Sequence, residues 1–457
     1  MKLCSASATV ILASTACLQG LATGFAPMAS AQVATTTDRV APGTISDADR
    51  GRILTQIETT IRNDYVFPDR TAAIIARLEQ ARRQGRYDVT DAGLLADRLT
   101  EDLSAVSGDR HLYVLYDPAH YAAATRPPEA AGAEDNDAYE RRLALRENSG
   151  LVEMKILGGN LRYLKIALFG WVADETGAAY DDAMRFLSGG DALIIDLRGN
   201  PGGDAAAVQY LVSHFLDPDI LEFSFLEGAN PPKQSRTLNY LPGGRIKNKP
   251  LYVLIDGNVG SAAESFAYDV QEFKLGELVG SRTIGAANNN RFVPIAPGLM
   301  FSLSYGRPVH AVNGANWEGV GVQPSVPAQP AQALEIAERL ALLRLKSSKN
   351  IAPNAVADYD WALVDVEARL NPVVLTPAKL ESLAGRYGDL TIAVEDGRLT
   401  MSRPKGPTRR LTPLTSDGLF EVDGLSSMLR VRFGTNALET LWKGDPQSRS
   451  YPRVPPA

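Results

Sequence analysis

Ser261 lies where an apolar run changes into a helical pattern. The segment 251–270 reads LYVLIDGNVGSAAESFAYDV, in which five apolar residues precede a DGN turn. A continuous apolar run bounded by turn residues predicts a strand buried on both faces, and the later apolar residues recur at helical spacing. Ser261 is therefore predicted to open a helix just beyond the carboxyl end of a strand, where open α/β sheets bind ligands.

Two roles are open for Ser261 from this stretch. A helix N-terminus offers free N–H groups and a partial positive charge to a developing oxyanion, which suits a nucleophilic serine. Serine is also a favoured helix N-cap, and on this stretch alone an ordinary cap is the more common case.

A second strand is predicted to end in a glycine-rich turn, in the segment DALIIDLRGNPGGD at 191–204. Gly202 and Gly203 can adopt positive φ and admit close approach of another backbone. One of their N–H groups could serve with that of Ala262 as the two donors of an oxyanion hole. A tight strand-to-helix turn without a catalytic role would have the same composition.

Taken together, these motifs resemble those of the tail-specific, or C-terminal processing, serine peptidases, including the tricorn-like and interphotoreceptor retinoid-binding-protein-like branch. The resemblance spans Arg50 to Arg344 and rests on five ordered motifs: YVFPDR at 65–70, DRH at 109–111, the glycine loop, SAAE from Ser261, and NWEGVGVQP at 316–324. Many of these proteases carry a peptide-binding PDZ module near residues 125–149. This chain has too few residues there for one, as in the retinoid-binding-protein-like branch.

An activated serine needs a base within hydrogen-bond reach and usually a third group that orients the base. The resemblance implies His111, in Asp109-Arg110-His111, as that general base. Arg110 stands where the family commonly has a small residue, and its cation could bind a substrate carboxylate. No catalytic role is expected for the other three histidines, one within a predicted helix and two in loops: His214, His120 and His310.

The resemblance implies Glu318 as the third member, because it matches the acidic residue of the branch's WEGxGxxP signature. A carboxylate on a tight glycine-rich loop can be held against imidazole Nδ1–H and fix its tautomer, although a surface glutamate beside a turn would look the same. Glu264 competes for this role but is predicted to cap its helix or line a substrate pocket. The family's alternative Ser–Lys pair is not expected, since Lys274 would lie roughly 20 Å along the helix from Ser261.

These residues predict a serine peptidase that works through an acyl-enzyme, with Ser261 as nucleophile, His111 as base and Glu318 orienting it. Oxyanion donors are expected from Ala262 and from Gly202 or Gly203. No metal or organic cofactor is implied, and the expected partner is a peptide or protein substrate. Two alternatives remain open: a non-catalytic binder of hydrophobic ligands or peptides, and an esterase that uses the same triad.

Strands alternate with helices from 150 to 345, which predicts an α/β core with a parallel or mixed sheet covered by helices. Helical spacing over 46–124 predicts a small N-terminal helical domain, and 125–149 is predicted to be a linker or insertion. Short alternating strands over 373–457, after a predicted linker at 346–372, predict a small all-β module. This module resembles lipocalin-like tail modules of some serine hydrolases, and a contribution to stability or solubility is its favoured role.

The first thirty-one residues have the features of a secretory signal peptide: a lysine, an apolar stretch and an ASA cleavage site. A flexible leader is expected over 32–45, and a periplasmic or secreted location follows. Both cysteines, Cys4 and Cys17, lie within the signal peptide, so cysteine nucleophiles and disulfides are excluded from the mature chain. A lipid anchor at Cys17 is not expected, because the aliphatic residue three positions before it is missing.

Composition places the chain among globular proteins. Of its 457 residues 45% are hydrophobic and 22% are charged, and the formal net charge is −6. No basic block of the kind that neutralises phosphates occurs, so a nucleic-acid partner is not expected. No stretch of eighteen apolar residues follows the signal peptide, so no membrane span is expected.

Overall fold

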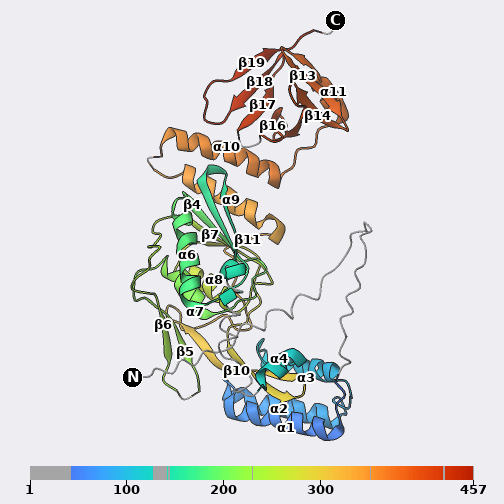
Figure 1. The fold of residues 1–457 in the computed structure, drawn as a ribbon, viewed down its shortest axis with the longest axis vertical. Coiled ribbons are helices and arrows are strands. Elements are labelled where there is room, and N and C mark those ends of the chain that lie inside the picture. The colour runs from blue at the N-terminus through green and yellow to red at the C-terminus, as the bar shows by residue number, and fades with distance from the viewer. Residues whose placement is uncertain are drawn as a thin grey trace.

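The computed structural model describes residues 43–126, 141–142, 145–228, 230–349, 351–425 and 428–455. The predicted signal peptide and residues 32–42 of the predicted leader lie outside this part of the chain. Three parts follow one another in Figure 1: helices α1 to α3 at one end, an α/β core in the middle, and a β module at the other end. Within the described residues, no helix has the length and apolar character needed to cross a membrane.

The N-terminal part packs three amphipathic helices over a short strand, and the candidate base lies between the third helix and that strand. Its elements are α1 (Asp47–Asp64), α2 (Pro68–Arg83), α3 (Ala92–Ser107), β1 (Tyr113–Tyr116) and α4 (Pro118–Ala124). Side chains of Ser46 and Asp91 cap α1 and α3 by accepting main-chain N–H groups. Helix α3 stops at Gly108, whose φ of 65° reverses the chain. That stop places Asp109 and His111 between α3 and β1.

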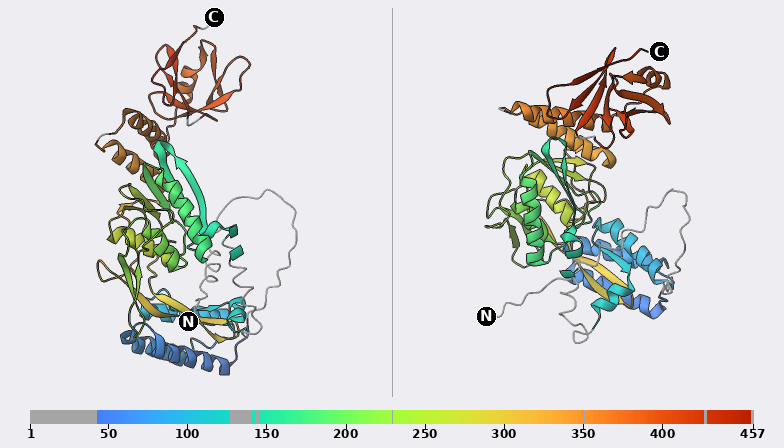
Figure 2. Two further views of the ribbon diagram at one scale, coloured as in Figure 1. Left: turned by 60° about the vertical axis from the view of Figure 1, so that its left-hand side comes forward. Right: turned by 45° about the horizontal axis from the view of Figure 1, so that its top comes forward.

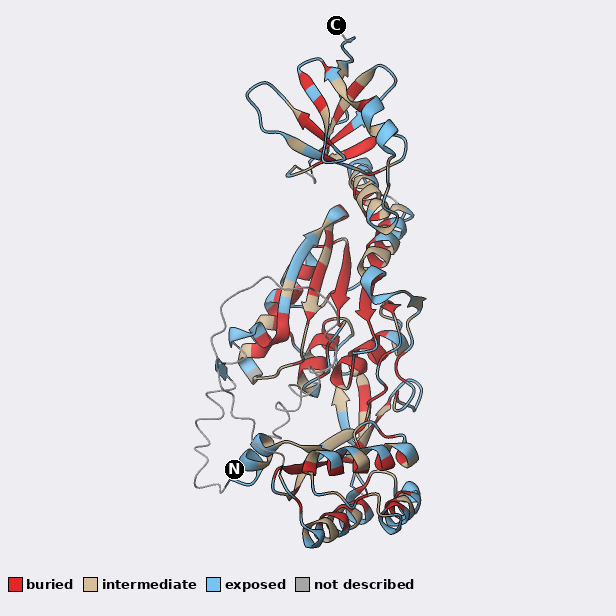
Figure 3. Cartoon of the chain, turned by 90° about the vertical axis from the view of Figure 1, so that its right-hand side faces the viewer, coloured by how far each residue is buried: buried red, intermediate tan, exposed pale blue. Residues whose placement is uncertain are grey.

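The core contains a six-stranded sheet in the order β11-β8-β7-β4-β3-β2, parallel except for β2. The strands are β2 (Leu151–Leu157), β3 (Leu161–Ile166), β4 (Ala192–Asp196), β7 (Leu251–Ile255), β8 (Glu277–Gly280) and β11 (Val326–Pro327). Every residue of the two central strands, β4 and β7, is buried, as Figure 3 shows in red. The predicted mixed α/β core with a covered sheet is therefore confirmed.

Helices cover both faces of this sheet. One face packs against α6 (Ala173–Ser188), α7 (Ala205–Ser213) and α8 (Ala262–Glu272). The other packs against α9 (Ala333–Lys346) and α10 (Pro353–Leu370). Helix α8, which begins one residue after Ser261, is buried along most of its length. The candidate nucleophile is thus fixed to a rigid part of the core.

A second sheet joins the N-terminal part to the core. Its strands are β5 (Leu221–Leu226), β6 (Lys233–Arg236), β9 (Asn289–Ala296) and β10 (Leu299–His310), together with β1. Strand β10 pairs with β1 and β9 at one end and with β5 at the other. Residues from β9 and β10 complete the apolar core under α1 to α3. Figure 2 shows β10 running from the core toward these helices.

The predicted linker at 346–372 instead contains helix α10. Tyr359, Ala362 and Val366 follow at helical spacing and pack on the sheet with α9. The β2–β3 turn fits closely against this helix pair, since a side chain at Gly159 would come within 2.3 Å of Leu342 Cδ2. This segment therefore belongs to the packed core.

The C-terminal module is an eight-stranded antiparallel sheet in which each strand pairs with the next. It follows α11 (Pro377–Leu383) and consists of β12 (Gly385–Tyr387), β13 (Leu390–Glu395), β14 (Arg398–Ser402), β15 (Arg409–Pro413), β16 (Leu419–Val422), β17 (Leu429–Phe433), β18 (Ala437–Trp442) and β19 (Arg449–Pro452). It has a hydrophobic core of its own. The predicted small all-β module is confirmed.

Candidate active site

Ser261 occupies a strained turn between β7 and α8. Its φ of 49° and ψ of −120° lie in a region that residues with a Cβ rarely adopt. An ordinary N-cap has extended backbone angles, so Ser261 is not a cap of the usual kind. Such sharp strand-to-helix turns present a serine hydroxyl at the edge of a sheet in other hydrolases.

The glycine loop packs directly against Ser261. A Cβ built on Gly202 would lie 2.8 Å from Ser261 Cβ and 3.0 Å from Ala262 N. Gly202 also has a φ of 120°, so a side chain there is excluded both by space and by backbone conformation. The two motifs predicted from the sequence therefore meet at the candidate nucleophile.

Main-chain geometry distinguishes the predicted oxyanion donors. The Gly202 N–H is occupied, because it donates to Asn200 Oδ1 at 2.9 Å. The Gly202 carbonyl accepts a hydrogen bond from Phe169 N at 2.8 Å. In a trans peptide the carbonyl and the N–H of the next residue, here Gly203, point in opposite directions. The N–H of Gly203, which is an exposed residue, therefore points away from Phe169. The Gly202 N–H is therefore not free to bind an oxyanion, and a donor role for Gly203 stays a prediction.

The Ala262 amide is oriented by the same argument. The carbonyl of Ser261 accepts from Ser265 N at 3.1 Å, so it points along α8. The N–H of the same peptide, which belongs to Ala262, points out of the helix N-terminus. Ala262 N also lies against the glycine loop, since a Cβ built on Gly202 would come within 3.0 Å of it.

Glu264 is a structural carboxylate. It is fully buried and accepts hydrogen bonds from Ser261 N at 2.9 Å, Gly285 N at 2.6 Å, Ala286 N at 2.8 Å and Thr283 Oγ1. Burial raises its pKa, and these donors oppose that shift. The predicted capping role fits the Ser261 contact, whereas the suggestion that Glu264 binds substrate does not fit a side chain with no exposed surface.

Asp109 and His111, from the segment between α3 and β1, come together with Glu318, which lies about two hundred residues later in the chain. One ligand atom from each lies within 4.8 Å of the others. Asp109 is buried, and its two oxygens accept from His111 N at 2.9 Å and from Tyr65 OH at 3.1 Å. Tyr65 belongs to the YVFPDR motif, but no pattern in the sequence indicates this contact with Asp109.

Glu318 is held by main-chain amides. Its Oε1 accepts from Arg110 N at 3.1 Å, and its Oε2 accepts from Ala287 N at 2.6 Å and Asn288 N at 2.9 Å. Burial and the Asp109 charge raise the pKa of Glu318 to about 7, against the effect of these N–H donors. Glu318 is therefore a positioned carboxylate beside His111, which distinguishes it from an ordinary surface residue.

Burial lowers the pKa of His111, and the charge of Asp109 partly offsets this. The imidazole is accordingly neutral at neutral pH and able to accept a proton. Its Nδ1 is buried and has no hydrogen-bond partner among the described residues. No hydrogen bond joins the Ser261 hydroxyl to His111 in the part of the chain that the structure covers; in substrate-free enzymes this contact is often long.

The remaining histidines have other surroundings. His214 caps the end of α7 with Nδ1 2.6 Å from the Gly244 carbonyl, and His120 lies in α4 against Phe292. His310, expected in a loop, is the buried last residue of β10. Its Nδ1 accepts from Val312 N, so its Nε2 carries the proton that is shared with Asp269.

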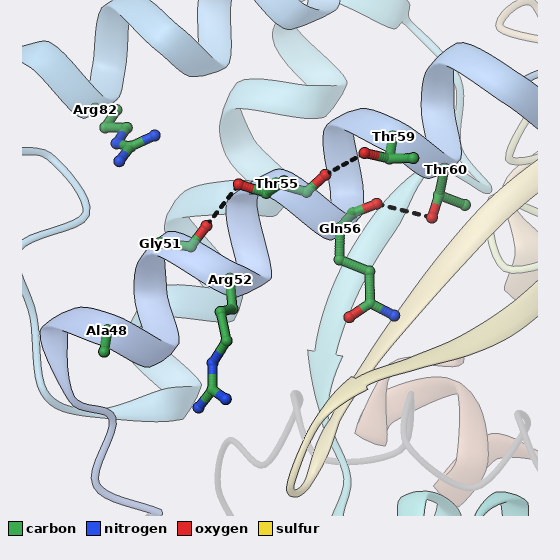
Figure 4. Close-up of a pocket in the computed structure, with 8 residues that line it drawn as sticks. All are labelled: Ala48, Gly51, Arg52, Thr55, Gln56, Thr59, Thr60 and Arg82. Carbon is green, nitrogen blue, oxygen red and sulfur yellow. Dashed lines mark hydrogen bonds between the residues drawn. The ribbon is translucent and has the colours of Figure 1, made fainter.

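Arg110 is exposed and forms no ion pair with any residue in the described ranges. Its predicted role in binding a substrate carboxylate stays a prediction. A hollow on the outer surface of α1 and α2 lies apart from all these residues (Figure 4). Three threonine hydroxyls there bond to carbonyls of their own helix, Thr55, Thr59 and Thr60, so they present no convergent set of polar groups.

Comparison with protein families decides the identity of the core. The sequence model of peptidase family S41 matches residues 160–328, and that of the N-terminal domain found with this peptidase in eukaryotic IRBP matches residues 47–143. Together the two matches take up more than half of the chain. The chain belongs to peptidase family S41. The S41 match contains the glycine loop, Ser261 and Glu318, and the N-terminal match contains His111.

Individual relatives share this S41 region. The chain is 28% identical over 178 residues to the carboxy-terminal processing protease CtpB of Bacillus subtilis, which is 38% of this chain and 35% of the relative. It is 29% identical over 127 residues to the nisin-resistance protein of Lactococcus lactis, or 25% of this chain and 39% of the relative. The matches thus span little more than a third of each relative's length. Among solved structures, the photosystem II D1 C-terminal processing protease aligns at 16% identity with a TM-score of 0.43, over 65% of this chain and 98% of that one.

Proposed function

We propose that this S41 chain is an exported serine peptidase that cleaves peptide bonds through an acyl-enzyme formed on Ser261. The observation that carries the proposal is the strained turn at Ser261, with two main-chain N–H groups directed outward beside it. A φ of this kind in a residue with a Cβ costs on the order of 1–3 kcal/mol and persists where the surroundings impose it, often at active sites.

In the proposed reaction, His111 removes the proton from the Ser261 hydroxyl as the oxygen attacks the substrate carbonyl carbon. The amides of Gly203 and Ala262 stabilise the negative charge that develops on the carbonyl oxygen. His111 then returns the proton to the leaving amine, and water hydrolyses the resulting ester by the same steps in reverse. Glu318 orients the imidazole and stabilises its protonated form.

The alternative of a non-catalytic binder gives no reason for a strained serine beside outward-facing amides. An esterase would use the same residues, because the acyl-transfer machinery does not itself distinguish an amide from an ester. Export to the periplasm or the medium is part of the proposal and rests on the signal-peptide features of residues 1–31.

The test is hydrolysis of a fluorogenic peptide and of a p-nitrophenyl ester by the purified full chain in EDTA. Ser261→Ala should lower kcat by about 10³-fold or more on both substrates. Ser265→Ala, four residues along the same helix, is the matched control and should behave as wild type. Wild-type turnover by a folded Ser261→Ala variant would contradict the proposal, and hydrolysis of the ester alone would favour the esterase.

A further inference from the structure

We infer that Asp109, His111 and Glu318 form a binding site for a divalent transition-metal ion of the zinc class, and that the bound ion reversibly blocks His111 as a base. The inhibitory part of this inference rests on the proposed peptidase function. The binding part does not, because it concerns only the three side chains.

The ligand set suits Zn²⁺ or Co²⁺. Zinc binds imidazole nitrogen and carboxylate oxygen at about 2.0–2.2 Å, and three protein ligands with one open position are common in sites that also hold water. Ligand atoms on a tetrahedral ion lie roughly 3.3 Å apart at these bond lengths. The three ligand atoms here all lie within 4.8 Å of one another. Side-chain rotations that move them about 1.5 Å closer together would give the separation that a tetrahedral ion requires.

The charge balance of the site calls for a cation. Asp109 is fully buried and Glu318 is half-buried beside it, yet neither carboxylate pairs with a lysine or arginine among the described residues. Two carboxylates at this distance repel each other in a medium of low dielectric constant. A divalent ion between them would remove that repulsion.

His111 supplies the second, independent observation. Its Nδ1 is buried and has no partner in the described parts of the chain. Leaving a buried polar atom without a partner costs about 1–3 kcal/mol. A bond from Nδ1 to the metal ion would remove that cost. Rotation of the ring, so that Nδ1 gains a hydrogen-bond partner while Nε2 binds the ion, would do the same.

The existing hydrogen bonds hold the carboxylates without using all their lone pairs. Each carboxylate oxygen has two lone pairs. Asp109 accepts one hydrogen bond at each oxygen, from His111 N and Tyr65 OH, and Glu318 accepts one at Oε1 and two at Oε2, all from main-chain N–H groups. Such contacts to ligating groups orient them for an ion. Nitrogen among the ligands favours zinc-class ions over Mg²⁺ and Ca²⁺, which prefer oxygen ligands.

The binding test uses the full chain carrying Ser261→Ala, so that catalysis plays no part. Co²⁺ is added and its visible absorption is followed, because a tetrahedral site gives a strong band, and Zn²⁺ is then added in competition. One ion should bind per chain, and Asp109→Asn or Glu318→Gln should each weaken binding at least about tenfold. His120→Gln, which removes another histidine outside the cluster, is the control and should leave the affinity unchanged.

Unchanged binding in both cluster variants, or binding lost in His120→Gln, would overturn the site. Thermal unfolding of each variant shows whether it is folded; if Asp109→Asn is not, Glu318→Gln decides the result alone. Zn²⁺ should inhibit the wild-type peptidase at concentrations that match its binding, and EDTA should restore the rate. Binding without inhibition would refute the inhibitory part, whereas a wild-type chain inactive in EDTA would refute the proposed function and leave the binding result standing.

Discussion

Glu264 and Glu318 are held by four consecutive amides of one loop. The N–H groups of Gly285 and Ala286 bond to Glu264, and those of Ala287 and Asn288 bond to Glu318. Glu264 in turn accepts from the main chain of Ser261, and Glu318 lies within the cluster around His111. This loop therefore connects the element that carries the nucleophile with the group beside the base.

Gly285→Ala should disturb the hydrogen bonds of the 285–288 loop to both Glu264 and Glu318. Gly285 has a φ of 88°, and a Cβ there would lie 2.9 Å from Gly321 N. The strain should cost roughly 1–3 kcal/mol of stability, and displacement of the loop should lower kcat/KM by up to about 100-fold. Gly314→Ala is the control, since its φ is also positive but nothing lies within 4 Å. Equal effects of the two changes on kcat/KM would show that the loop does not position the site.

The nucleophile and its supporting loop could be predicted from local sequence patterns. An apolar run followed by helical spacing located Ser261 between β7 and α8. The glycines of the loop at 199–203 predicted a close backbone approach, which Gly202 makes to Ser261. These features depend on neighbours along the chain, so the sequence alone carries them.

Long-range contacts could not be predicted in this way. The amides at 285–288 bond to carboxylates that lie between 21 and 31 residues away along the chain, and no periodicity marks such contacts. Whether the Gly202 N–H is free or hydrogen-bonded depends on the orientation of the Asn200 side chain, which accepts from it. The sequence predicts a linker where helix α10 forms, because the apolar residues of α10 are buried only by packing against the sheet and α9.

The pH dependence of kcat/KM should depend on Glu318 and Asp109. Burial places the pKa of His111 below its ordinary value of about 6.5, whereas the pKa of Glu318 is raised to about 7. If ionised Glu318 is required, the wild-type rate in EDTA should rise with pH through a midpoint near 7, set by Glu318. Glu318→Gln should move that midpoint to lower pH and reduce the plateau, by up to about 10⁴-fold as for a lost orienting carboxylate.

Asp109→Asn is a second test of how the carboxylates beside His111 set the pH midpoint of kcat/KM. The Asp109 charge raises the pKa of both His111 and Glu318, so its removal should shift the rise to lower pH while most of the plateau remains. The Tyr65 hydroxyl can reverse its hydrogen bond to accept from the new amide. A midpoint that stays unchanged in both variants would mean that neither carboxylate influences the base.

Stability should decrease with rising pH because of Glu222. This residue is 2% exposed, and burial together with the Asp269 charge raises its pKa from 4.5 to about 8. Between these values the folded chain binds more protons than the unfolded chain, so the free energy of unfolding falls as pH rises, by at most about 1.4 kcal/mol per pH unit. The loss is complete above pH 8 and absent below pH 4.5.

Glu222→Gln should remove this dependence and keep the hydrogen bond from Ser235. Denaturant unfolding at pH 5 and pH 8 should show a greater gain for the variant at pH 8. Glu227→Gln, which removes a partly exposed ion pair with Lys233, is the control and should change stability by no more than about 1 kcal/mol at either pH. A Glu222→Gln effect that is the same at both pH values would argue against a protonated Glu222.

Truncation should separate the C-terminal module from the peptidase core. Arg430 of the module stacks 3.9 Å from the Trp361 ring centroid and pairs with Asp365, both on α10. A chain ending at Asn371 keeps α10 and should remain soluble and active on small substrates. A chain ending at Lys346 exposes the apolar surface that α10 covers and should unfold at a lower temperature or aggregate. A soluble but inactive chain ending at Asn371 would show that the module contributes to the site.

The most direct measurement for the whole account is labelling with a fluorophosphonate probe, which reacts covalently with activated serine hydroxyls. The purified full chain is labelled in EDTA, digested and mapped by mass spectrometry, with Ser265→Ala, Ser261→Ala and His111→Ala alongside. A single modification is expected at Ser261, retained in Ser265→Ala and lost in both other variants. Labelling at a different serine, or undiminished labelling of folded Ser261→Ala, would contradict it.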